Sequence, residues 1–105
     1  MMYESGQEGE VLERFERELG ANISEFEHGL NLGVPGKWDS PSACLYRIQY
    51  EGVELEIEIL SQGERSIASL TLPLLKVAYT FRSGSKEQRL ALLSRMDLAM
   101  QRGGG

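Results

Sequence analysis

Few side chains in this sequence could carry chemistry, and they are scattered along the chain. His28 is the only histidine and Cys44 the only cysteine, which excludes a metal site built from several histidines or thiolates. The two could still pair as a nucleophile and its base. We expect Cys44, however, to face the core at the start of a strand, where a buried thiol is inert. His28 falls in a predicted loop as an ordinary surface histidine. The sequence therefore predicts no catalytic group, and a protein that is not an enzyme.

Three glutamates, Glu54, Glu56 and Glu58, alternate with apolar residues and would share one face of a strand. Side chains two residues apart on a strand are separated by about 7 Å. Two carboxylates at that spacing need a third oxygen ligand to hold a hard cation. Weak binding of a divalent metal stays an alternative. We expect a solvated, aggregation-resistant surface instead, and we predict no metal or other cofactor.

The chain ends in three glycines, Gly103, Gly104 and Gly105. Ubiquitin-like modifiers and small sulfur carriers also end in Gly-Gly, because a bare glycine carboxylate can enter the narrow channel of an adenylating enzyme. A carrier activated at its C-terminus is therefore one alternative function. Such carriers usually extend the tail from a final strand, whereas here it follows a predicted helix. We expect Gly103 to end that helix and residues 103–105 to be disordered, as are residues 1–7.

The only tryptophan, Trp38, lies in a segment that is rich in glycine and proline. This composition disfavours regular structure, so residues 21–42 are predicted to form a long irregular loop. Trp38 would either anchor the loop against the sheet or present an exposed aromatic side chain for binding. In a further alternative, the part from His28 to Trp38 covers a small ligand at one end of the sheet.

Acidic and basic residues are divided unevenly along the chain. Residues 1–64 contain fourteen acidic and four basic side chains, whereas residues 65–105 contain two acidic and seven basic ones. The two parts could neutralise each other in one fold, or form patches of opposite sign that guide a charged partner or self-association. Arg82 and Arg95, from the basic part, join Trp38 and His28 as candidate binding residues. The net charge of −5 argues against a nucleic acid as the partner.

Two segments have the apolar spacing of amphipathic helices. In the first, residues 8–19, one stripe would contain Val11, Leu12, Phe15 and Leu19. In the second, Ser85 and Gln88 form a capping box. The stripe of this second helix would contain Leu92, Leu93, Met96, Ala99 and Met100. Leu98 would point away from it.

Between the helices, four runs alternate in the manner of half-buried strands. The first two flank Glu51-Gly52, a two-residue turn that would pair Tyr50 with Val53. This register gives one apolar face from Cys44 to Tyr50 and from Val53 to Ile59.

The third and fourth strands are placed by weaker signals. A turn at Gln62-Gly63 would set Ile57 opposite Ala68 and Leu55 opposite Leu70. The fourth strand runs from Leu75 to Phe81. It follows either a wider turn at Pro73 or a bulge at Pro73 within one long bent strand.

With 105 residues, the chain is predicted to form a single α+β domain. Its N-terminal and C-terminal helices would pack on one face of a four-stranded antiparallel meander, which makes two layers. No apolar run approaches the roughly 20 residues of a membrane span, and the acidic N-terminus does not resemble a signal peptide. We therefore expect a cytoplasmic accessory domain, a monomer or weak homodimer, whose partner is another protein rather than a nucleic acid or a membrane.

Overall fold

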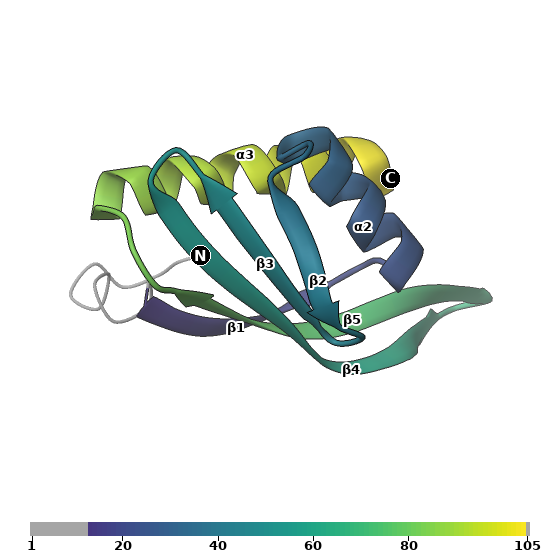
Figure 1. Cartoon of the computed structure of the whole chain (residues 1–105). Helices are drawn as coiled ribbons and strands as arrows, with labels where there is room; N and C mark the ends of the chain where they lie inside the picture. Colours follow the sequence, from purple (N-terminus) through teal and green to yellow (C-terminus); the bar gives the residue numbers. More distant parts are fainter. Residues whose placement is uncertain (1–12, 105) are drawn as a thin grey trace.

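The computed structural model describes residues 13–104, with side chains through residue 101. A five-stranded antiparallel sheet is covered on one face by two helices (Figure 1). The predicted two-layer α+β class is confirmed, but the sheet has five strands instead of four. The strands are β1 (Arg14–Leu19), β2 (Trp38–Ser42), β3 (Leu45–Tyr50), β4 (Val53–Ile67) and β5 (Leu70–Phe81), and the helices are α2 (Ile23–Gly33) and α3 (Lys86–Gly104). Strands β2 to β5 form a meander, and β1 lies outside β5, in the order β1-β5-β4-β3-β2.

Strand β1 corrects the prediction of an N-terminal helix at residues 8–19. Residues 8–12 lie outside the described residues, but Arg14–Leu19 pair antiparallel with β5, Phe15 opposite Tyr79. The segment alternates strictly between half-buried and exposed side chains, which is the period of a strand. The sequence of this segment fits both the spacing of a helix and the alternation of a strand. The segment is a strand because it pairs with the edge of β5.

Helix α2 and strand β2 correct the prediction of a loop at residues 21–42. A capping box begins α2: Asn22 Oδ1 accepts from Glu25 N at 2.8 Å, and Asn22 N donates to Glu25 Oε1 at 2.9 Å. The glycines within α2 allow it to approach α3 closely. A Cβ at Gly33 would lie 3.1 Å from the Cβ of Ala99. These glycines are positions of helix contact, although in the sequence they looked like helix breakers.

The β3–β4 hairpin has the predicted register, with Tyr50 opposite Val53. Both residues of its turn, Glu51 and Gly52, have positive φ, as a tight hairpin turn requires. The prediction that Cys44 faces the core was wrong. Cys44 lies in the turn between β2 and β3 and is exposed, because the chain reverses there to pair the two strands.

The β4–β5 hairpin turns at Ala68-Ser69 and not at Gln62-Gly63. Ile57 therefore lies opposite Tyr79, and not opposite Ala68. The register shifts by one residue between Ile59 and Ser61. This bulge exchanges the faces of β4, so that Ile57 and Ile59 lie on the core face but Ile67 lies on the opposite face. Strand β5 runs through Pro73 without a break, so the alternative of one long strand is correct and the irregularity lies in β4.

The core lies between the sheet and the helices. Strands β3, β4 and β5 supply most of it, together with Phe26 and Leu30 from α2 and the predicted stripe of α3. The capping box of α3 is confirmed, with Gln88 N donating to Ser85 Oγ and Ser85 N donating to Gln88 Oε1. Helix α3 continues through Gly103 and Gly104, where we expected it to end. In the described part of the chain, neither helix has the length and apolar character needed to cross a membrane.

Candidate functional site

The four predicted binding residues lie on four different elements. Trp38 begins β2, His28 is exposed on α2, Arg82 follows β5, and Arg95 lies on α3. Within residues 13–101, no hydrogen bond, ion pair or ring contact joins any two of them. The structure therefore does not assemble the predicted binding residues into one site, and each is considered with its own neighbours.

Trp38 is half-buried and held by neighbouring side chains. Its indole Nε1 donates to Asn31 Oδ1 at 3.1 Å, and its ring lies 5.7 Å from the ring of Tyr46. These are the contacts of an anchor that packs against the sheet edge. The adjoining hollow, about 470 Å³, is lined largely by charged and polar residues such as Lys37 and Arg47. Small-molecule pockets are mostly apolar, so this hollow has the character of open polar surface.

Arg95 connects α3 with α2 and β3. Its Nε donates to the carbonyl oxygen of Gly33 at 2.5 Å, and its guanidinium carbon lies 5.0 Å from the centre of the Tyr50 ring. A cation at the C-terminal end of α2 satisfies a free carbonyl and complements the helix dipole. These contacts give Arg95 a structural role in joining the two layers.

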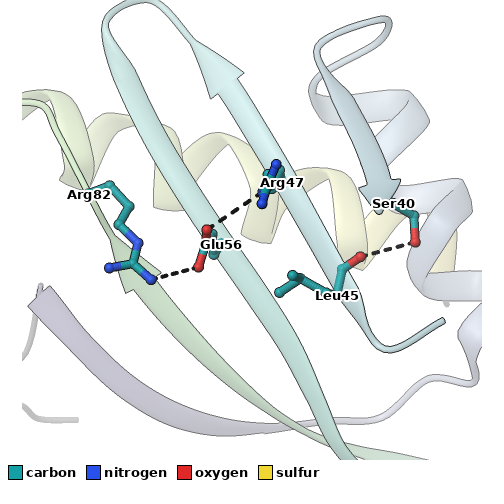
Figure 2. A network of polar contacts seen from close by, with 5 residues as sticks. All are labelled: Ser40, Leu45, Arg47, Glu56 and Arg82. Carbon is teal, nitrogen blue, oxygen red and sulfur yellow. Dashed lines mark hydrogen bonds and ion pairs between the residues drawn. The ribbon is translucent and has the colours of Figure 1, made fainter. Parts of the chain in front are cut away.

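Arg82 shares the carboxylate of Glu56 with Arg47 on the uncovered face of the sheet (Figure 2). Arg82 Nη2 lies 2.8 Å from Glu56 Oε1, and Arg47 Nε lies 3.6 Å from Glu56 Oε2. The hydrogen bond to Glu56 raises the pKa of Arg82. Because the central glutamate of the Glu54-Glu56-Glu58 series is neutralised by two arginines, the series is not a row of free carboxylates. No group of three or more metal-binding side chains occurs among the described residues.

The acidic and basic parts of the chain are paired across this same face. Arg65 contacts Glu18 at 3.2 Å and Lys76 contacts Glu16 at 3.9 Å, in addition to the pair between Arg82 and Glu56. All three pairs join a basic residue after position 64 to an acidic residue before it. These contacts match the first interpretation of the charge pattern, in which the two parts neutralise each other.

Two buried tyrosines also carry titratable groups. The hydroxyl group of Tyr46 donates a hydrogen bond to Glu27 Oε2 at 2.7 Å. Burial is the larger cause, and this hydrogen bond the second, of the raised pKa of Tyr46. Burial raises the pKa of Tyr79 to about 12, against the opposing effect of Arg17. Arg17 in turn bonds Asp97 of α3 at 2.6 Å. Both phenols stay protonated at neutral pH and act as structural contacts between the layers.

The feature that the sequence did not predict is a two-stranded arm, residues 60–74. Pairing between β3 and β4 extends only to Glu58, and pairing between β1 and β5 ends at Leu75. Between these points and the turn, β4 and β5 pair only with each other, and the arm projects past both helices (Figure 1). We call this segment the β4–β5 arm.

The β4–β5 arm exposes large apolar side chains. Ile67, Leu70 and Leu72 are 50%, 60% and 41% exposed. The pairs Ile67↔Leu70 and Arg65↔Leu72 place all three on the sheet face opposite the helices, since partners in an antiparallel ladder share a face. We call these three side chains the apolar arm face. The alternation of leucines from Leu70 to Leu74 was a signal for this strand, but the glycine at position 63 suggested an earlier turn.

The fold and its surface define a two-layer α+β domain with a protruding β-hairpin arm. Comparison of the chain with protein-family models, with curated proteins and with solved structures gives no match. The class of function must therefore be argued from the described surface alone.

Proposed function

We propose that this chain is a cytoplasmic accessory domain, without catalysis of its own, that binds another protein through the apolar arm face. The observation that carries the proposal is the exposure of Ile67, Leu70 and Leu72 side by side on a projecting hairpin. Adjacent exposed apolar side chains on a soluble protein mark interaction surfaces, and removing them from water favours association by about 25 cal/mol per Å² of apolar area.

The other surfaces offer weaker support for binding. Trp38 and Arg95 are held by contacts within the domain, and Glu56 is neutralised by arginines. A partner would have to break these contacts, whereas the side chains of the apolar arm face are exposed among the described residues. The strands of the arm are already paired with each other, so a partner does not have to fold this segment in order to bind it.

The test compares two triple variants in affinity capture from native extract. Substitution of Ile67, Leu70 and Leu72 by threonine keeps the β propensity of the arm while removing most of its apolar surface. The control variant replaces the exposed leucines of the helical layer, Leu32, Leu90 and Leu98, with glutamine. We expect the wild-type chain and the control variant to retain the same specific protein, and the arm variant to bind it at least tenfold more weakly.

The melting temperatures of the two variants serve as the check on folding. Since all six side chains are exposed, neither variant should lose much stability. Retention of the same protein by the arm variant at wild-type affinity would show that binding occurs elsewhere and would refute the proposal.

A further inference from the structure

The β4–β5 arm has two free edges, and its register shows which backbone groups face them. Ile67 and Leu70 close a two-residue turn at Ala68-Ser69, and the pair that closes such a turn is hydrogen-bonded. Antiparallel pairs alternate between hydrogen-bonded and non-hydrogen-bonded, so the pairs Ser66↔Thr71 and Glu64↔Pro73 are of the second kind. The amide and carbonyl groups of these residues point outward, away from the partner strand.

On β4, the outward residues are Gln62, Glu64 and Ser66, all exposed. The last hydrogen bond on this side of β4 is from Ile59 N to the carbonyl oxygen of Cys44, at 2.8 Å. Beyond it, β3 is absent because the chain turns at Cys44. The β4 edge of the arm therefore presents three alternating residues with unpaired backbone groups.

The β5 edge of the arm is blocked. Its outward residues beyond β1 are Thr71 and Pro73, and proline has no amide hydrogen to donate. Proline at an outward position is a common device against strand addition. The two edges thus differ: β5 is protected, and β4 is open.

We propose that the β4 edge of the arm pairs with the same edge of a second copy of this chain, across a two-fold axis perpendicular to the sheet. Residues 59–75 contain only two charges, Glu64 and Arg65, which cancel. The net charge of this segment is therefore zero, and it repels a second copy little. The inference concerns the edge of the arm and is independent of the apolar arm face used in the proposed function.

The paired arms would set both apolar arm faces on the same side of one continuous sheet. The dimer would therefore present a doubled apolar surface to any further partner.

The experiment measures the mass of the unmodified chain by light scattering across a concentration series. We expect a concentration-dependent rise toward twice 11.7 kDa. Glu64→Pro removes an outward amide of β4 without breaking the β4–β5 ladder, and should weaken dimerisation at least tenfold. The matched control, Thr71→Pro, removes an outward amide of β5 and should leave dimerisation unchanged.

Two results would overturn the inference: a monomer at every concentration, or a dimer that Thr71→Pro dissociates and Glu64→Pro does not. Neither result bears on the capture of another protein by the apolar arm face. Failure of the edge pairing is therefore distinguishable from failure of the proposed function.

Discussion

The contact between α2 and α3 at Gly33 predicts that one added methyl group will destabilise the domain. A Cβ at Gly33 would lie 3.1 Å from the Cβ of Ala99 and 3.7 Å from the carbonyl oxygen of Arg95. Ala99 is almost fully buried and has no rotamer through which it could move away. In Gly33→Ala the helices must therefore separate by a few tenths of an ångström, and this shift disturbs the packing around them.

The magnitude follows from two opposing effects. Alanine is favoured over glycine inside a helix by at most about 1 kcal/mol, whereas overpacking of a core costs about 1–3 kcal/mol. Gly33→Ala should thus lower the free energy of unfolding by roughly 1–2 kcal/mol. Ala99→Gly alone should lower it by about 1–2 kcal/mol, through helix propensity and the loss of one buried methyl group.

The double variant Gly33→Ala/Ala99→Gly moves the methyl group from one helix to the other and leaves the contact unchanged in volume. Its stability should therefore be within about 1 kcal/mol of the wild type. The double-mutant cycle then gives a coupling energy of roughly 1–4 kcal/mol.

Urea unfolding of the four proteins, followed by far-ultraviolet circular dichroism, measures this cycle. Gly20→Ala is the control, because a Cβ at Gly20 meets nothing within 4 Å. Additivity of the two single substitutions within about 0.5 kcal/mol would refute the argument that this contact is sterically closed.

Two further predictions concern the ends and the interior of the domain. Asn22→Ala removes the side-chain half of the α2 capping box and should lower the free energy of unfolding by about 1 kcal/mol; no loss relative to Ser24→Ala, an exposed control in the first turn, would contradict it. Tyr79 has its pKa raised from 10.0 to about 12 by burial, so its neutral form is favoured in the folded state. The contribution of Tyr79 to stability should be constant below pH 10 and fall as the pH rises toward 12, by roughly 1.4 kcal/mol per pH unit. In Tyr79→Phe, the loss of stability above pH 10 should be smaller. If every tyrosine of the folded protein showed tyrosinate absorbance near pH 10, the raised pKa of Tyr79 would be disproved.

Local patterns in the sequence were sufficient where chemistry within a few residues decides the structure. The capping box of Ser85 and Gln88 and the apolar stripe after it predicted α3, and Leu98 is exposed as its position on the helix required. The turn at Glu51-Gly52 fixed the β3–β4 register because a two-residue turn allows only one pairing of the strands.

The structure predicted for two glycines was wrong. Gly33 was interpreted as a helix breaker and Gly63 as a turn residue, yet one lies at a close helix contact and the other inside β4. Glycine allows unusual backbone angles but also close approach of another element. At Gly33 the close approach is used, whereas Gly63 uses neither property, because a Cβ there would meet nothing within 4 Å and its φ is not positive. The turn of the arm instead falls at Ala68, which has a positive φ without being glycine.

The sequence predicted single candidate residues but not the residues that they contact. The sequence identified Trp38, Arg82 and Arg95 as unusual, but their partners, Asn31, Glu56 and the carbonyl group of Gly33, are seven or more residues distant. No pattern in a single sequence reports such contacts. The four candidates therefore proved to be separate.

By itself, the sequence determined the α+β class, the C-terminal helix and the central hairpin, because propensity, caps and alternation act over a few residues. The tertiary structure decided that Arg14–Leu19 is a strand, since this segment pairs with the edge of β5, which lies far away in the sequence. It also decided the length of the β4–β5 arm. The bulge after Ile59 sets the register of two long strands, and that register depends on which side chains the core accepts.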